Sequence, residues 1–196
     1  MTLREQAIDR FQEWFSQAQE CAAIADATAM TLATVSEGGQ PGARTVLLKG
    51  VDHRGFVFYT NTRSRKGRHL AVQPRAAVCF YWAPLNLQVL VEGEVGQVSD
   101  EEADAYFASR PRLSQIGAWA SEQSQPLDSL ETLAERVSTL EQDYADRTVP
   151  RPPHWTGYRI DPAFMEFWAA ADGRLHRRER YERGDDGTWS HCFVNP

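Results

Sequence analysis

Cysteine is scarce in this chain of 196 residues, and the few cysteines lie far apart. The three of them, Cys21, Cys79 and Cys192, are odd in number and form no CxxC pair. This pattern argues against a disulfide framework or a cysteine-based zinc site and favours a reducing cytoplasm. Long hydrophobic runs are absent too, since no stretch approaches the roughly 18 apolar residues of a membrane-spanning helix. The charged, amphipathic start MTLREQAIDRFQEWF lacks the apolar core of a secretory signal.

Lysine is nearly absent, because Lys49 and Lys66 are the two lysines among 21 basic residues. The formal net charge of −6 gives no reason to expect a general attraction to nucleic acid. The acidic balance is uneven, however, since the segment from Arg44 to Arg75 holds eight basic residues and a single acid, Asp52. Such a local concentration of cations in an acidic protein predicts a site for a small, densely charged anion.

Signatures of unaided catalysis are also missing. The chain has no GxxxxGK followed by Ser or Thr, and it has no Ser-His-Asp or catalytic cysteine signature. The histidines at 53, 69, 154 and 191 do not have the spacing of metal ligands. We therefore predict no metal site and no hydrolase that works without a cofactor.

The hydrophobic pattern predicts a strand-rich chain with a few helices. Strands are expected at 29–35, 43–50, 56–60, 76–82 and 87–99, and further closing strands within 150–196. Helices are expected at 2–19, 64–74, 99–109 and 128–144, with a polar loop at 110–126. Because a long antiparallel meander has to hide its edges, we predict a mainly β or α+β protein that forms a barrel. We expect a single domain over residues 1–196, with its first helix inside 1–20.

Two basic motifs lie in the first half of the chain. In RTVLLKG, strand alternation would place Arg44 and Lys49 on opposite, otherwise apolar faces. Each cation then needs a partner, although an edge strand whose cations reach into water also explains the motif. In YTNTRSRKGRH, Arg65 and Lys66 stand at a helix start, where free N–H groups and the helix dipole favour a phosphate. A solvated basic turn is the alternative.

Two further motifs follow. In YFASRPRLSQIGAW, the side chains of Tyr106, Arg110 and Ser114 would converge if the helix ends at Pro111 and the chain folds back. All three donate hydrogen bonds to phosphate oxygens, so this motif predicts a second anion site. In GRLHRRERYER, Arg174, His176 and Arg178 would share one face if the segment is a strand, while a solvated basic strand is the commoner interpretation.

Two phosphate sites without a nucleophile or a metal predict a phosphorylated cofactor that performs the chemistry beside a phosphorylated substrate. The motifs RTVLLKG, FVFYTNTRSRKGRHL, YFASRPRLSQIGAWAS, HWTGYRIDP, EFW and RLH occur in this order. Together they resemble the pyridoxamine 5′-phosphate oxidase family of flavin enzymes, from about Ala29 to the C-terminus. The element SRPRLSQIGAW is the most specific part of this resemblance.

The resemblance implies a split β-barrel with flanking helices and a homodimer that holds FMN at the subunit interface. It also implies that residues 150–196 are the closing strands of the family's C-terminal dimerisation region. It implies that the FMN contacts are Arg44, Lys49, Tyr59, Thr60, Arg65, Lys66, Gln88, Gln123, Ser124, Trp168 and Arg178. It implies that the substrate phosphate lies among Lys49, Tyr106, Arg110 and Ser114, and that Arg174 and His176 are catalytic residues facing the pyridine ring. Arg112 is not among these residues and is expected to be structural.

The implied reaction is oxidation of pyridoxamine or pyridoxine 5′-phosphate to pyridoxal 5′-phosphate, with O₂ as the acceptor. The chain departs from the family pattern at Ala169–Ala171, at Arg177 and at Phe193–Asn195. These departures leave two alternatives open. One is a related flavin oxidase acting on another ring, such as a phenazine precursor. The other is a non-catalytic split-barrel protein that binds FMN, heme or pyridoxal phosphate.

Overall fold

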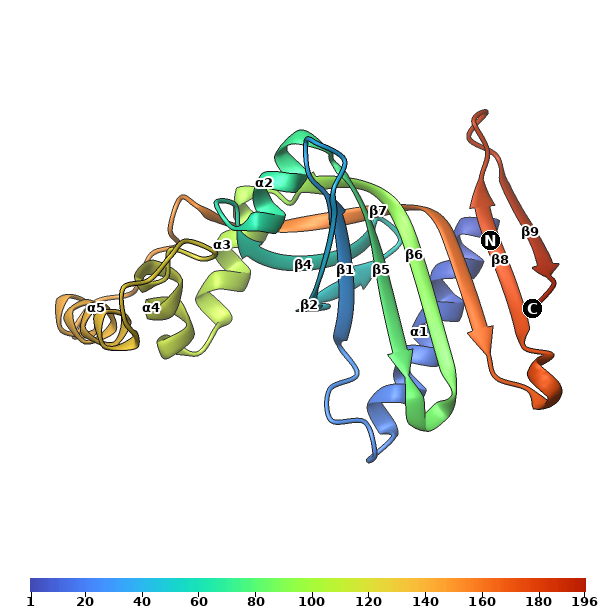
Figure 1. The fold of residues 1–196 in the computed structure, drawn as a ribbon, viewed down its shortest axis with the longest axis horizontal. Coiled ribbons are helices and arrows are strands. Elements are labelled where there is room, and N and C mark those ends of the chain that lie inside the picture. Colours follow the sequence, from blue (N-terminus) through green and yellow to red (C-terminus); the bar gives the residue numbers. More distant parts are fainter.

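The computed structural model describes residues 1–196 and consists mainly of one antiparallel sheet of nine strands, which curls into a half-barrel with flanking helices (Figure 1). This confirms the mainly β, α+β prediction. The strands are β1 (Ala29–Val35), β2 (Pro41–Leu47), β3 (Gly50–Asp52), β4 (Gly55–Asn61), β5 (Arg75–Trp82), β6 (Leu87–Gln97), β7 (Trp155–Ala169), β8 (Arg177–Arg183) and β9 (Trp189–Val194). Their order is β2-β1-β5-β6-β7-β4-β3, and the β8–β9 hairpin attaches to β7.

The helices are α1 (Leu3–Glu20), α2 (Arg65–Val72), α3 (Asp100–Ser109), α4 (Arg112–Ala120) and α5 (Leu130–Asp143), with short 3₁₀ turns η1 (Ala83–Leu85) and η2 (Asp172–Arg174). Helix α1 begins at the capping box that the sequence predicts, in which Thr2 and Glu5 satisfy each other's backbone N–H groups. Its buried side chains, among them Phe11 and Trp14, pack against the rings of Phe56, Phe80 and Phe167. No helix of the structure has the length and apolar character needed to cross a membrane.

Strand β7 organises the sheet because it pairs with β6 along nearly its whole length and with a different strand on each half of its other edge. Its first half pairs with β4, and its second half pairs with β8. The register shifts between Glu92 and Gly93, opposite Pro162, which has no N–H to donate. A side chain at Gly93 would meet the Asp161 carbonyl at 1.9 Å, so this bend requires glycine. The sequence analysis expected several closing strands within 150–196, and residues 155–169 of that range form one long strand, bent at Pro162.

The helix α4 corrects the prediction of a polar loop at 110–126. Its first turn follows Pro111, and the side chain of Gln115 donates to the carbonyls of Phe107, Ala108 and Arg110 at the end of α3. These contacts tie the two helices together although the local composition is polar. Helix α5 packs against α4 and contributes no fully buried residue. Both helices lie at the end of the molecule opposite the β8–β9 hairpin (Figure 1).

Candidate functional site

A cavity of about 570 Å³ opens where the edge strand β2, the end of β4, the start of α2 and the end of α3 meet. Most of the predicted site residues line it, namely Arg44, Lys49, Tyr59, Thr60, Arg65, Lys66, Tyr106, Arg110, Gln123 and Ser124. Ser114 lines an adjoining cavity of about 330 Å³, whose wall also includes Arg110. The two basic motifs and the Tyr106–Ser114 motif, far apart in the sequence, are therefore neighbours in space.

The five cations of the larger cavity share one property: none has a carboxylate within 4.0 Å. They are Arg44, Lys49, Arg65, Lys66 and Arg110. In a chain with 27 acidic residues, this absence of partners is a local feature of the cavity. Cations that are gathered without counter-charges favour an anionic ligand.

The start of α2 forms the first part of this anion site. Ser64 caps the helix by accepting from the N–H of Gly67 at 3.3 Å. A side chain at Gly67 would meet the Thr62 carbonyl at 2.2 Å, so only glycine allows the turn to close this tightly. The free N–H groups of this first turn, with Arg65 and Lys66 beside them, suit a phosphate group.

Lys66 is only 9% exposed, and its ammonium is held by uncharged partners. It donates to Thr60 Oγ1 at 3.0 Å and to Gln123 Oε1 at 3.3 Å. Burial, with the nearby charge of Arg44, lowers the pKa of Lys66. An anion placed here would favour the charged ammonium and raise this pKa again, so the site is arranged to gain a negative ligand.

Arg44 reaches the cavity from the middle of β2. Its Nη1 donates to Thr34 Oγ1 at 2.7 Å and to the Leu32 carbonyl at 3.1 Å, which fixes the guanidinium. Burial and the charge of Arg65 lower the pKa of Arg44. The sequence pattern had placed Arg44 and Lys49 on opposite strand faces. Both line the same cavity, because β2 ends at Leu47 and the alternation stops before Lys49.

Stacked aromatic rings form one wall of the larger cavity, and two of them, Tyr59 and Trp155, also line the smaller one. Tyr59 stacks on Tyr106 with ring centroids 4.0 Å apart and on Trp155 at 5.2 Å. Arg110 lies over the Trp155 ring at 4.7 Å, and its Nη1 is buried without a hydrogen-bond partner. Burial lowers the pKa of Arg110, while the neighbouring Tyr106 opposes the shift. An unpaired guanidinium N–H beside flat rings suits a planar ligand that carries an anionic group.

Trp155 was missed as a site residue by the sequence analysis. It reaches the wall because Asn61 of β4 pairs with it across the sheet, and that pairing joins positions far apart in the chain. The available signal was an aromatic residue at the start of a strand, directly after the proline-rich segment VPRPP. An aromatic residue in such a place is as typical of the hydrophobic core as of a binding site.

The remaining predicted residues form a second group, outside both cavities. Gln88, Trp168 and Arg178 are cross-strand neighbours on β6, β7 and β8, and the His176 ring lies 4.6 Å from that of Trp168. Arg178 forms a two-pronged contact with Glu166, which is 3% exposed. In Figure 1, β4 and α3, which line the larger cavity, lie on one side of β5 and β6, and β8 lies on the other, so one chain carries the two groups apart.

The expected strand face of Arg174, His176 and Arg178 was wrong. Strand β8 begins only at Arg177, and Arg174 belongs to the turn η2 with a φ of +61°. The segment turns because Gly173 also has a positive φ, of +63°, which continues the tight turn before the strand starts. Arg174 is exposed, and His176 accepts from the N–H of Ala171 through Nδ1 at 3.3 Å.

Comparison with known proteins gives matches along nearly the whole chain. Residues 17–142 match a family model described as pyridoxamine 5′-phosphate oxidase. Residues 155–196 match one described as the pyridoxine 5′-phosphate oxidase C-terminal dimerisation region. A pyridoxine/pyridoxamine 5′-phosphate oxidase of Alkalilimnicola ehrlichii is 56% identical over 100% of both chains. One of Myxococcus xanthus is 58% identical over 96% of this chain and 91% of its own.

Solved structures resemble the fold as well. PhzG from Burkholderia lata, in complex with tetrahydrophenazine-1-carboxylic acid, has a TM-score of 0.91 and 33% identity, covering 96% of this chain and 92% of its own. A pyridoxamine 5′-phosphate oxidase-related, FMN-binding protein from Nostoc punctiforme has a TM-score of 0.75 at 19% identity, covering 95% of this chain and 97% of its own. The second likeness concerns the fold alone.

Proposed function

We propose, on the premise that this chain belongs to the pyridoxamine 5′-phosphate oxidase family, that it oxidises pyridoxamine or pyridoxine 5′-phosphate to pyridoxal 5′-phosphate. O₂ takes up the two electrons and becomes H₂O₂, and with the amine substrate water replaces the nitrogen, which leaves as NH₃. The observation that carries the proposal is the cavity of unpaired cations, in which a helix-start phosphate site and the Arg110 site share one aromatic wall.

The residues present fit FMN. The Nη1 of Arg110 is buried without a partner, and the cations beside the start of α2 have no counter-charge, so both places favour phosphorylated ligands. When bound, FMN supplies a hydride acceptor that O₂ reoxidises. Arg65 and Lys66 would bind its phosphate at the helix start. The full set of proposed FMN contacts is Arg44, Lys49, Tyr59, Thr60, Arg65, Lys66, Gln88, Gln123, Ser124, Trp168 and Arg178.

The substrate is held by its own phosphate. Lys49, Tyr106, Arg110 and Ser114 would bind that group, which does not react, and thereby orient the ring that does. Arg110 is the central donor because its guanidinium is fixed by Trp155 and one of its N–H groups has no other partner. Arg174 and His176 would act as catalytic residues that face the pyridine ring and its C4′ carbon.

The chain forms a homodimer, in keeping with its match to a C-terminal dimerisation region. We propose that the two groups of site residues meet across the dimer, so that the cavity of one protomer faces the Trp168–His176 group of its partner. Residues 1–196 would then act as one domain whose closing strands serve dimerisation. We further propose a cytoplasmic location, because all three cysteines are free thiols, as a reducing compartment maintains them.

A peroxide assay of the FMN-loaded protein tests the function. Its substrates are pyridoxamine 5′-phosphate, pyridoxine 5′-phosphate, unphosphorylated pyridoxamine and tetrahydrophenazine-1-carboxylic acid. We expect peroxide from the two phosphorylated vitamers and little from the unphosphorylated control. Turnover of the phenazine compound alone would support the alternative of an oxidase acting on another ring, the ligand of the PhzG structure. A yellow protein without turnover of any substrate would support a binding protein.

A further inference from the structure

The helix α3 brings two phosphate-binding side chains, Tyr106 and Arg110, to the cavity. In its first half, the fully buried Ala103 packs on Val57 of β4 and on Val98, which directly follows β6. Toward its C-terminal end, Tyr106 stacks on Tyr59. The rotation of α3 about its own axis therefore decides where both ligand-facing side chains point. Ala103 is small, and the large buried side chain of α3, Phe107, packs on Trp155 near the C-terminal end of the helix, so the first turn of α3 depends more on polar contacts.

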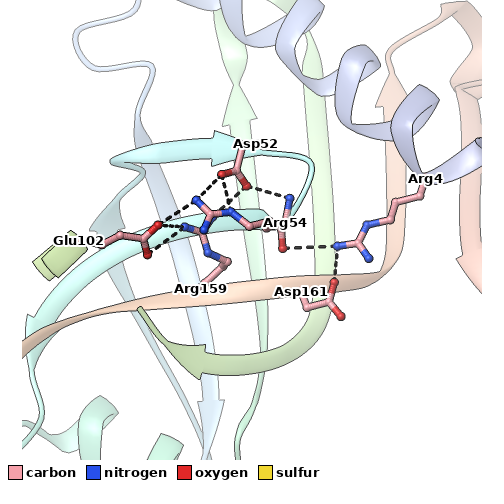
Figure 2. A network of polar contacts seen from close by, with 6 residues as sticks. All are labelled: Arg4, Asp52, Arg54, Glu102, Arg159 and Asp161. Carbon is pink, nitrogen blue, oxygen red and sulfur yellow. Dashed lines mark hydrogen bonds and ion pairs between the residues drawn. The ribbon is translucent and has the colours of Figure 1, made fainter. Parts of the chain in front are cut away.

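Ion pairs hold the other end of the helix: Arg151 binds Asp100 and Asp104 of α3, and an ionic ring holds Glu102. Figure 2 shows Arg159 of β7 between two carboxylates, donating to Asp52 Oδ1 at 2.9 Å and to Glu102 Oε1 at 3.2 Å. Arg54 joins the same two carboxylates at 2.8 Å each. The four charges alternate in sign, and they connect α3 to β7 and to the β3–β4 hairpin. None of the four residues lines the cavity.

Arg159 is the main member of this ring. Its side chain is 16% exposed, whereas that of Arg54 is 64% exposed, so water screens the contacts of Arg54 far more. Arg159 and Trp155 are four residues apart on β7 and so project from the same strand face. Glu102 and Tyr106 are four apart on α3 and lie on one helix face. The same face of β7 and the same face of α3 therefore meet twice. Arg159 contacts Glu102 in the ionic ring, and Trp155 lies in the aromatic wall with Tyr106.

We propose that Arg159 and Glu102 are positioning residues that set the rotation of α3 and thereby aim Tyr106 and Arg110 at the substrate phosphate. Neither residue touches the substrate. The inference rests on the proposed function and deepens it, because it assigns substrate affinity to an ion pair outside the cavity. The Arg159–Glu102 pair would affect substrate binding alone. The contacts at the start of α2, which would bind the FMN phosphate, involve no residue of α3.

The test uses Arg159→Gln in the full-length, FMN-loaded protein. The expected result is a rise of about 3- to 30-fold in KM for pyridoxamine 5′-phosphate, with kcat changed less than about threefold. The Kd of pyridoxal 5′-phosphate, measured by equilibrium dialysis, should rise in parallel. The Kd of FMN, measured by quenching of flavin fluorescence, should stay the same, since the helix α2 is untouched. A merely structural loss would weaken both ligands together.

Arg4→Gln is the matched control. Figure 2 shows Arg4 paired with Asp161, two residues after Arg159 on the same strand, and donating to the backbone carbonyl of Arg54 at 3.4 Å; these contacts connect α1 to β7 and to the β3–β4 turn, and none reaches α3. The Arg4 side chain is 28% exposed, so its removal deletes a comparably shielded ion pair. The control should leave KM and both Kd values unchanged. If Arg4→Gln raised KM as much as Arg159→Gln, the effect would belong to general destabilisation, and the proposal would be wrong.

Glu102→Gln is the second variant, and it decides the question should Arg159→Gln fail to fold. The Glu102 side chain is 34% exposed, and the hydrogen bond from its backbone N–H to Ser99 Oγ remains in place. An unchanged KM and pyridoxal phosphate Kd in Glu102→Gln would overturn the proposal. Failure of the proposed function would be seen in another measurement, because the wild-type protein would then yield no peroxide from either vitamer. The dialysis measurement would still report on the ion pair in that case.

Discussion

The guanidinium carbon of Arg110 lies 4.7 Å from the ring centroid of Trp155, and this contact holds the guanidinium over a flat surface while its Nη1 is left buried and unpaired. A buried donor without a partner costs roughly 1–3 kcal/mol, so a ligand that accepts from it gains affinity. Arg112, two residues further on, behaves differently. It donates to the backbone carbonyls of Tyr144 and Arg147 and so ties α4 to the end of α5.

This contrast predicts different effects of two neighbouring substitutions. Arg110→Ala should raise KM for the phosphorylated substrates by the equivalent of about 1.5–3 kcal/mol, or roughly 10- to 150-fold, because a charge-assisted contact to phosphate is lost. Arg112→Ala serves as the control and should lower the melting temperature without changing KM. Steady-state peroxide assays and thermal unfolding measure the two effects. An Arg110→Ala protein with wild-type KM would remove Arg110 from the substrate site.

The lowered pKa of Lys66 predicts that FMN binding weakens as the pH rises. In the free protein, burial and Arg44 bring this pKa below its ordinary 10.5, whereas a bound phosphate dianion favours the charged ammonium and raises it again. Between the two values, binding must take up a proton, so affinity falls by at most about tenfold per pH unit. Fluorescence titration from neutral pH upward, toward the ordinary lysine pKa of 10.5, measures this slope.

Two controls isolate the lysine. Riboflavin lacks the phosphate, so its weaker binding should not follow the same pH slope. Lys66→Met should bind FMN less tightly and without this slope, because the titrating group is gone. A wild-type FMN affinity that stays constant over this range would show that Lys66 does not meet the phosphate.

Gly157 predicts a steric effect on the aromatic wall. A Cβ at this position would lie 2.6 Å from Tyr59 Cε1 and 2.7 Å from Val98 Cγ2, so Gly157→Ala must displace the Tyr59 ring. Overpacking of this kind costs about 1–3 kcal/mol, and we expect a lower melting temperature together with weaker FMN binding. Gly96→Ala, on the adjacent strand, meets nothing within 4 Å and should change neither quantity. Equal behaviour of the two variants would contradict the assignment of Tyr59 to the site.

The features that the sequence predicted well are those decided within a few residues. The capping box of Thr2 and Glu5 is local, and so is the arrangement of Arg65 and Lys66 at a helix start after Ser64. Helix α4 was missed because side-chain contacts with the end of α3 stabilise it, not its own composition. The aromatic wall was missed for a related reason, since pairing of β4 with β7 brings Trp155 beside Tyr59. The resemblance to a family supplied the residue roles, which no spacing in the chain determines.

The separation of the site residues into two groups predicts that inactive chains complement each other. Lys66→Met damages the cavity group, and His176→Ala damages the group on β7 and β8. If each active site combines the cavity of one protomer with the Trp168–His176 group of the other, a mixed dimer contains one undamaged site and one site with both defects. Dissociating, mixing and reassociating the two inactive variants should therefore restore up to half of the wild-type activity in each mixed dimer. Either variant treated alone is the control. If each chain carried a complete site, every site in the mixed dimer would hold one defect, and mixing would restore no activity.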